Sequence, residues 1–419
     1  MISRISLIYI ITGDSLHILV LTDEIYPDAI GGVAKSLYNE CTALVRRGNE
    51  VTVIVRGIDR TLALEDTIEG VRIVRLFGPA RSSLFYYLYV FSTVINFIRW
   101  LRRSTSRFDV IYVHNPLLIL SVQLSGLHRV APIAYTFHAP MYEEIHISVS
   151  AGKYGLLNPI AWLGGWIIRL VEARVLRLAD VVFPRSQFSY ANLHQLCPEA
   201  SIPEPLIPLG VNTQVYAPYE HEDARKALGL PQDIPILLTV RRLAHRMGLQ
   251  NLIAAMKTVR EKHPDALLLI AGKGPLLETL KQQISSLRLQ DAIRLLGLIS
   301  ESDLILYLGA ADLFVLPTEF LEGFGLATLE ALSSARPVVG TPNGATPELL
   351  APIDGSLLTR DASAQALSDA LGYWLDRRES LPALGVRCRG EVEAHYDIDK
   401  VAEQLEQRFQ TLISSKQSG

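Results

Sequence analysis

The sequence has 419 residues, a length that suggests two domains, or three at most, at about 100 to 200 residues per domain. Hydrophobic residues make up 49% of it and charged residues 20%, so the chain has ample apolar material for hydrophobic cores and is neither disordered nor collagen-like. The 40 basic and 43 acidic side chains give a net charge of −3, which argues against a nucleic-acid partner because such partners are bound through an excess of basic charge.

The N-terminal half alternates short β-branched or leucine-rich runs with helical patterns, which is typical of a parallel sheet built from βαβ units. Residues 5–11 are apolar, but no small-residue cleavage pattern follows them, so we do not expect a signal peptide. Strands are predicted at residues 17–21, 51–55, 110–113, 133–137 and 181–184, and helices at residues 33–47 and 159–178.

Residues 84–98 are rich in aromatic and β-branched side chains, but they are fewer than the roughly 20 residues that cross a bilayer. A polar stripe with helical spacing begins in this segment and continues past it, formed by Ser92, Asn96, Arg99 and Arg103. Arg102 lies alongside the stripe and Arg107 just beyond it, so the helix ends in a basic cluster. Two interpretations stay open: a buried helix with a solvated polar stripe, and a helix that rests on an anionic membrane surface.

The C-terminal half repeats the alternation of strands and helices. Strands are predicted at residues 236–240, 266–271, 293–296, 313–316 and 337–340, and helices at residues 249–262, 276–287, 301–308, 325–332 and 399–414. A proline-rich stretch separates the two halves and suits a linker. We therefore expect two Rossmann-like α/β domains at residues 1–205 and 219–398, a linker at residues 206–218 and a C-terminal helix at residues 399–419.

Parallel sheets bind ligands beyond the carboxyl ends of their strands, so the loops that follow strands are where a site is expected. After the first strand, Gly31 and Gly32 precede a helix, where backbone N–H groups can approach an anion; a simple tight turn is the alternative. His138 follows the strand at residues 133–137. Its imidazole either forms a hydrogen bond with the backbone of the loop or takes part in the reaction.

No nucleotide-cofactor loop is recognisable in the sequence. The loop after the first strand is not a GxGxxG motif, and the segment Gly272-Lys273-Gly274-Pro275 lacks a third glycine. Redox chemistry with a bound cofactor therefore loses support.

Three arginines follow the strand at residues 236–240: Arg241, Arg242 and Arg246. At a strand end and just before a helix, guanidinium groups can hold a pyrophosphate through charge-assisted hydrogen bonds. The alternative is a solvated basic loop.

The strongest cluster of candidate residues is the segment 319–330. Gly323 and Gly325 expose backbone amides where a loop becomes a helix, Glu322 lies at the start of that helix, and Glu330 follows eight residues later. Two carboxylates that flank a glycine pair can accept hydrogen bonds from several sugar hydroxyls at once.

These features together resemble a known family. Gly31-Gly32, His138 after Thr136-Phe137, Arg242-Leu243, and above all the spacing from Glu322-Gly-Phe-Gly to Glu330 are similar to the nucleotide-sugar glycosyltransferases of retaining family 4. The resemblance spans nearly the whole chain, from about His17 to Tyr396. It implies the GT-B fold, in which two Rossmann-like domains with parallel sheets face an interdomain cleft.

The resemblance also implies a role for each matching residue. His138 would lie near the reacting centre, Arg242 would hold the leaving diphosphate, and Glu322 would contact hydroxyls of the donor sugar. The implied donor-binding residues are Gly31, Gly32, Arg246, Gly274, Gly323, Phe324, Gly325, Leu326 and Glu330. Family members usually carry lysine where this chain has Met247, and Arg246 is the expected substitute.

The implied activity is the transfer of a sugar from a UDP- or GDP-sugar donor to a glycan or a lipid-linked acceptor, with retained anomeric configuration and no cofactor. No metal ion is expected, because the only Asp-x-Asp pair, Asp397 and Asp399, does not follow a hydrophobic strand. The three cysteines form no CxxC pair, which fits a reducing cytoplasm, with peripheral contact to the cytoplasmic membrane face left open. A nucleotide-sugar epimerase and a nucleotide-sugar-binding protein without turnover are the alternatives.

Overall fold

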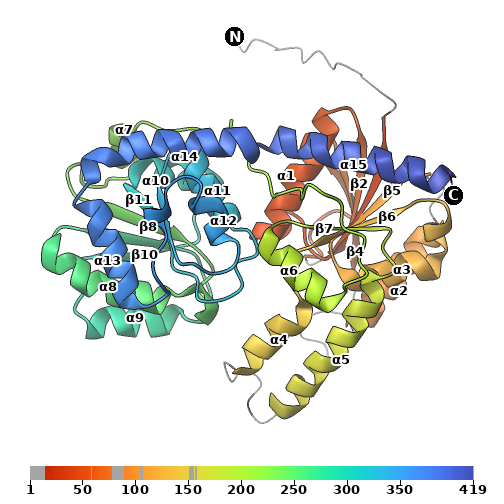
Figure 1. The fold of residues 1–419 in the computed structure, drawn as a ribbon, viewed down its shortest axis with the longest axis horizontal. Coiled ribbons are helices and arrows are strands. Elements are labelled where there is room, and N and C mark those ends of the chain that lie inside the picture. The colour runs from red at the N-terminus through yellow and green to blue at the C-terminus, as the bar shows by residue number, and fades with distance from the viewer. Residues whose placement is uncertain are drawn as a thin grey trace. The chain divides into compact units, whose positions relative to one another are not determined.

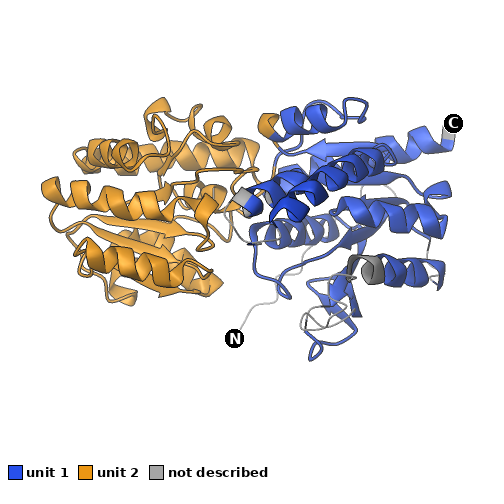
Figure 2. Ribbon diagram, turned by 90° about the horizontal axis from the view of Figure 1, so that it is seen from below, with its two compact units in different colours: residues 1–185, 189–208, 398–419 blue, residues 186–188, 209–397 orange. Residues whose placement is uncertain are grey.

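The computed structural model describes residues 15–57, 59–77, 89–103, 107–150, 155 and 158–418. It divides into two compact units, coloured separately in Figure 2. Unit 1 comprises residues 1–185, 189–208 and 398–419, and unit 2 comprises residues 186–188 and 209–397. The main boundary, between Pro208 and Leu209, falls within the expected linker at residues 206–218. Two features were not expected: the C-terminal helix is part of unit 1, and residues 186–188 are part of unit 2. The apolar residues 5–11, for which we do not expect a signal peptide, lie outside the described residues.

Unit 1 is built on a seven-stranded sheet with the strand order β3-β4-β2-β1-β5-β6-β7. Its strands are β1 (His17–Thr22), β2 (Glu50–Gly57), β3 (Glu65–Ile68), β4 (Val71–Phe77), β5 (Val110–Val113), β6 (Ile133–Phe137) and β7 (Val181–Pro184). Neighbouring strands are parallel except β3, which pairs antiparallel with β4. The five predicted strands are confirmed, whereas β3 and β4 were not predicted. Strand β3 is an edge strand with mostly exposed polar residues, and arginines interrupt the apolar pattern of β4.

The described helices of unit 1 are α1 (Gly32–Arg46), α2 (Tyr89–Arg103), α3 (Pro116–Ser125), α4 (Met141–Ser150), α5 (Asn158–Leu176), α6 (Gln187–Leu196) and α15 (Ile398–Ser418). The first two residues of α6 are assigned to unit 2. Helix α15 packs along α1 (Figure 1) and buries Val401, Leu405 and Phe409 in the core of unit 1. An ion pair of 2.7 Å between Arg47 Nε and Glu406 Oε2 borders this contact.

Unit 2 has a five-stranded parallel sheet with the order β10-β9-β8-β11-β12. Its strands are β8 (Ile236–Val240), β9 (Leu267–Ala271), β10 (Ile293–Gly297), β11 (Leu313–Leu316) and β12 (Val338–Gly340). Its helices are α7 (His221–Ala227), α8 (Leu249–Lys262), α9 (Leu277–Ser286), α10 (Glu301–Ala310), α11 (Leu326–Ser333), α12 (Thr346–Leu350), α13 (Ala364–Leu375) and α14 (Leu381–His395). The strand order reverses between β8 and β11, and ligands of such sheets bind at the carboxyl ends of strands at this point.

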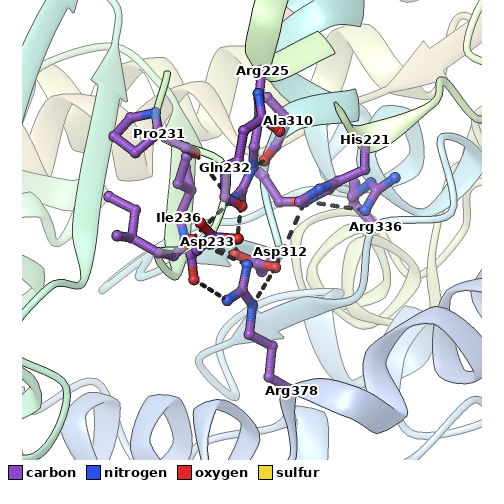
Figure 3. Close-up of polar contacts among 12 residues, drawn as sticks. His221, Arg225, Pro231, Gln232, Asp233, Ile236, Ala310, Asp312, Arg336 and Arg378 are labelled. Carbon is purple, nitrogen blue, oxygen red and sulfur yellow. Dashed lines mark hydrogen bonds and ion pairs between the residues drawn. The ribbon is translucent and has the colours of Figure 1, made fainter. Parts of the chain in front are cut away.

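A buried polar network closes the opposite, amino-terminal edge of this sheet (Figure 3). Arg225, which has no exposed surface, donates from Nη2 to Asp312 Oδ2 at 2.9 Å and from Nε to the Ala310 carbonyl at 2.9 Å. Asp312 also accepts from the backbone N–H of Ile236 at 2.7 Å and from Arg378 Nε at 2.8 Å. The network therefore joins α7, α10 and the beginning of β8, and we infer that it stabilises unit 2.

Candidate active site

The loops after β8 and β11 meet where the strand order of unit 2 reverses. Arg241 directly follows β8, and Glu322 lies between β11 and α11. Arg241 Nη2 is 2.5 Å from Glu322 Oε2, and the two side chains are only 7% and 13% exposed. Thr318 Oγ1 donates to the same carboxylate oxygen at 2.9 Å. The carboxylate is therefore fixed from both strand ends.

The surroundings of Glu322 keep it ionised. Burial by itself would raise the pKa of this carboxyl, but the charge of Arg241 and the hydrogen bonds from Arg241 and Thr318 outweigh it and lower the pKa. Glu322 is thus an acceptor of hydrogen bonds at neutral pH, suited to binding hydroxyl groups and unsuited to donating a proton.

The three arginines of the β8 loop have different surroundings. Arg241 is buried against Glu322 and Met247, whose Sδ is 3.2 Å from Arg241 Nη2. Arg246 is partly buried and donates from Nη1 to the Leu321 carbonyl at 3.0 Å. Arg242 is exposed. The structure therefore brings Arg241, and not Arg242, to Glu322, and the diphosphate contacts of Arg242 and Arg246 stay predictions.

The predicted donor-binding segment from Gly323 to Leu326 forms the entry to α11. Gly325 precedes the helix with φ of 89°, in the left-handed region that favours glycine, and no side chain caps the helix. The first N–H groups of a helix have no partner within the helix, so an uncapped start can bind an anion. A Cβ at Gly325 would lie 3.6 Å from Glu322 Oε1, which places this helix start beside the carboxylate.

Two apolar side chains anchor the same segment. Phe324 and Leu326 are buried, and the ring of Phe324 lies 5.8 Å from that of Tyr396. A hydrogen bond holds the backbone as well, because the Ser186 hydroxyl donates to the Gly323 carbonyl at 3.0 Å. The amides at the start of α11 are consequently held in place by packing around them.

The second motif carboxylate, Glu330, has other partners. It lies on α11, is 5% exposed and is hydrogen-bonded to the Tyr216 hydroxyl, whose oxygen also lies 2.5 Å from Glu301 Oε2. Burial, followed by the charges of Glu330 and Glu301, raises the pKa of Tyr216, so its hydroxyl keeps its proton. The motif thus places one carboxylate beside the arginines and the other in a tyrosine-centred group; donor binding by Glu330 stays a prediction.

Gly274 follows β9, the neighbour of β8. A Cβ at this position would lie 2.3 Å from the Leu243 carbonyl oxygen, so the close approach of the two loops requires glycine. This packing accounts for the residue without a ligand, and its predicted donor contact is not tested.

In unit 1, His138 follows β6 and forms a pair with His114, which follows β5. His138 Nε2 is 3.2 Å from His114 Nδ1. Burial, together with the nearby charge of Arg185, lowers the pKa of His138 to about 3. Burial, followed by His138 and Arg185, also lowers the pKa of His114. Both imidazoles are therefore neutral at physiological pH, and one donates its proton to the other.

Gly31 and Gly32 lie at the start of α1, where both are exposed. A Cβ built on either residue would meet no atom within 4 Å, so packing within the structure does not require glycine here. Asn115 Nδ2 donates to Asp23 Oδ2 near this loop, at the strand-order reversal between β1 and β5. Sequence reasoning missed Arg241 as the partner of Glu322. It also missed Thr318, His114, Asp23 and Asn115, although all five residues lie within two positions of a strand end, which was the available signal.

Two family models match this chain, one in each half. The model described as Glycosyltransferase Family 4 matches residues 30–215, and the model described as Glycosyl transferases group 1 matches residues 220–387. A GDP-mannose-dependent alpha-(1-6)-phosphatidylinositol monomannoside mannosyltransferase of Mycolicibacterium smegmatis is 31% identical over 285 residues, 64% of this chain and 73% of that protein.

Two further similarities differ in extent. A GDP-mannose-dependent monoacylated alpha-(1-6)-phosphatidylinositol monomannoside mannosyltransferase of Corynebacterium glutamicum is 32% identical over 208 residues, 48% of this chain and 54% of that protein, so the match spans about half of that relative. The structure of sucrose-phosphate synthase from Thermosynechococcus elongatus has a TM-score of 0.80 at 23% identity and covers 95% of this chain and 99% of that one. This likeness, with the two parallel-sheet units, confirms the predicted GT-B fold. The chain belongs to the group 1 glycosyl transferases of glycosyltransferase family 4.

Proposed function

We propose that the protein moves a sugar from a nucleotide-diphosphate donor to an acceptor hydroxyl with retained anomeric configuration. The observation that carries this proposal is the ionised carboxylate of Glu322, fixed by Arg241 beside the uncapped start of α11. The carboxylate can bind sugar hydroxyls, and the helix amides next to it can bind phosphate oxygens.

Cleavage of the bond between sugar and diphosphate places negative charge on the departing oxygen. Preorganised cations and amides lower the barrier when they face that developing charge. The amides at the start of α11 and the exposed guanidinium of Arg242 would serve this role. Arg246 would assist, because a guanidinium has five N–H groups and the hydrogen bond from Nη1 to the Leu321 carbonyl uses one of them.

We propose that the departing diphosphate itself takes the proton of the acceptor. A histidine whose pKa is about 3 is a weak base at neutral pH, so His138 is suited to orienting a hydroxyl by hydrogen bonding. His114 fixes the ring of His138 for this purpose.

The proposed reaction uses no metal ion and no cofactor. The Asp-x-Asp carboxylates, which would be the metal-binding candidates, already have structural partners: Thr213 Oγ1 donates to Asp397 at 2.5 Å, and Arg46 pairs with Asp399 at 2.7 Å. Their contacts support a structural role for both residues.

A GDP-sugar donor and a lipid-linked acceptor at the cytoplasmic membrane face are the most specific form of the proposal. The two mannosyltransferase relatives are named for GDP-mannose and for phosphatidylinositol mannosides, which supports this choice. A UDP-sugar with a glycan acceptor is the second choice, because the carboxylate of Glu322 and the amides at the start of α11 can bind sugar hydroxyls and phosphate oxygens but do not distinguish the base.

Thermal stabilisation by GDP, UDP and ADP, followed by a transfer assay with the matching nucleotide sugar, tests the proposal. We expect one nucleotide to stabilise the protein and transfer to require both donor and acceptor. Donor converted to an isomeric nucleotide sugar without acceptor would instead indicate an epimerase. Binding without transfer over a broad panel of acceptors would indicate a protein without turnover.

A further inference from the structure

One face of α5 in unit 1 is apolar and exposed. Ile160, Leu163, Ile167 and Leu170 recur with the spacing of a single helical stripe, and they are 69%, 58%, 56% and 72% exposed. The opposite face of the helix is buried, as shown by Gly165, Glu172, Val175 and Leu176.

Two indole rings extend this stripe. Trp162 and Trp166 are 51% and 40% exposed and lie one helical turn apart, with their ring centroids separated by 6.0 Å. Figure 1 shows α4 and α5 side by side, reaching away from the sheet of unit 1. A contiguous exposed surface of large apolar side chains is uncommon on soluble proteins and marks an interaction site.

The charges on α5 indicate which partner fits. Its only acidic residue, Glu172, is 1% exposed and accepts from the backbone N–H of Met141, so it does not reach the exposed face. The exposed face carries Arg174 instead, and the guanidinium of Arg169 lies 5.3 Å from the centroid of the Trp166 ring. Two copies of this face would bring basic groups together without a carboxylate of α5 to pair with them, whereas an anionic lipid surface complements them.

We propose that α5 docks the protein on an anionic lipid surface, with the stripe from Ile160 to Leu170 among the acyl chains and the indole and guanidinium groups at the level of the headgroups. Helices with an apolar face, tryptophan and basic residues lie in this region of a bilayer. Among the helices of the described residues, none is both long and apolar enough to span a bilayer.

This inference assigns lipid contact to α5 and not to the basic segment at residues 84–103. In the described part of α2, Phe97 and Leu101 are buried in the core of unit 1, and Arg102 donates to the Leu124 carbonyl at 2.8 Å. Residues 84–88 and the side chain of Ser92 lie outside the described part. Helix α2 thus turns Phe97 and Leu101 inward, while α5 turns the stripe from Ile160 to Leu170 outward.

Flotation with vesicles of equal parts phosphatidylglycerol and phosphatidylcholine tests the proposal, using the full chain. The variant Leu163→Ser/Ile167→Ser/Leu170→Ser should bind at least about tenfold more weakly than the wild type, since each exposed side chain contributes only when lipid covers it. Because the three residues are exposed, the melting temperature should stay unchanged. Arg174→Glu should weaken binding most at low salt, and vesicles of phosphatidylcholine alone should bind less.

Two control variants make the result specific. Leu64→Ser/Val130→Ser/Val386→Ser removes equally exposed apolar side chains elsewhere and should leave binding unchanged. Arg99→Glu/Arg102→Glu/Arg103→Glu tests the other basic helix. The proposal is overturned if the wild type does not float, if the α5 variant floats like the wild type, or if only the α2 variant loses binding.

Sedimentation velocity without vesicles separates lipid docking from self-association. A wild-type dimer that becomes a monomer in the α5 variant would show that the face joins two copies, and it would overturn the proposal. If the triple variant does not fold, Leu170→Ser alone replaces it, because this side chain is the most exposed of the stripe. Vesicle binding needs neither donor nor turnover, so its failure and a failure of the proposed sugar transfer are distinguishable.

Discussion

Arg241 and Glu322 form a buried ion pair between the ends of two neighbouring strands, with 2.5 Å between Nη2 and Oε2. Removing one partner of such a pair leaves a buried charge without compensation and typically costs about 3 to 5 kcal/mol. Substitutions of Glu322 will therefore change both stability and catalysis, and experiments must separate the two effects.

Glu322→Gln should reduce transfer by about 100-fold, the size found when one preorganised polar group is lost from a reacting centre. It should also lower the free energy of unfolding, because Arg241 loses its counter-ion. Urea unfolding and initial rates on folded protein measure the two effects. The double variant Arg241→Met/Glu322→Gln should be less destabilised than the sum of the single variants; additive values would contradict a coupled pair.

Arg242→Ala should remove most transfer and weaken nucleotide-diphosphate binding by at least about tenfold, while the free energy of unfolding stays within about 0.5 kcal/mol of the wild type. The reason is that this side chain is exposed and forms no hydrogen bond or ion pair with the described residues. Titration calorimetry and thermal melts measure these quantities. Arg360→Ala, at a side chain that is 76% exposed, is the matched control, and equal activity of both variants would refute the assignment.

Met247→Lys should destabilise unit 2 by about 2 to 4 kcal/mol, since it would bury a second cation where Met247 Sδ now lies 3.2 Å from Arg241 Nη2. Combining it with Arg241→Ala should recover part of that loss by removing the repulsion. Chemical unfolding of the three variants provides the measurement. No recovery in the double variant would show that the two side chains do not share this space.

Asp312→Asn should lower the free energy of unfolding by about 3 kcal/mol or more, because Arg225 and Arg378 would lose their shared carboxylate. Nucleotide affinity of the remaining folded protein should not change, since the network lies at the opposite edge of the sheet from Glu322. Differential scanning calorimetry and binding at low temperature test both statements. A large loss of affinity at full stability would place Asp312 in the site instead.

Acidification should destabilise unit 1 through His138. Its pKa is about 3 in the folded protein and near 6.5 when unfolded, so the unfolded chain binds the proton first and stability falls as the pH drops below the unfolded value. His138 should contribute about 1 kcal/mol of this loss between about pH 7 and pH 5.5. Unfolding of His138→Gln should show a shallower pH dependence, with a remainder from His114; an unchanged slope would exclude this origin.

All strands except β3 and β4 were predictable, because most of them are short, nearly continuous apolar runs, as in Val110–Val113. The location of the candidate site was predictable too, since Arg241 and Glu322 follow strands. The sequence did not predict which arginine contacts Glu322. Consecutive residues at a strand end point to opposite sides, and the course of the following loop determines which of them faces the carboxylate.

The exposed face of α5 was equally hidden in the sequence. Its apolar residues predict a helix, but the same spacing is found in a helix whose face is packed against a core. The structure distinguishes an exposed face from a face packed against a core. Helices α3 and α4 pack against α5 but leave Leu163 and Leu170 uncovered.

The return of α15 to unit 1 determines how this chain can be dissected. Unit 2 is nearly one uninterrupted stretch, residues 209–397, whereas unit 1 needs both ends of the chain. A fragment that stops at residue 208 would lack Val401, Leu405 and Phe409 and leave a hollow in its core. Chimeras between relatives should therefore exchange residues 209–397 as an internal cassette and keep the original tail with the original N-terminal half.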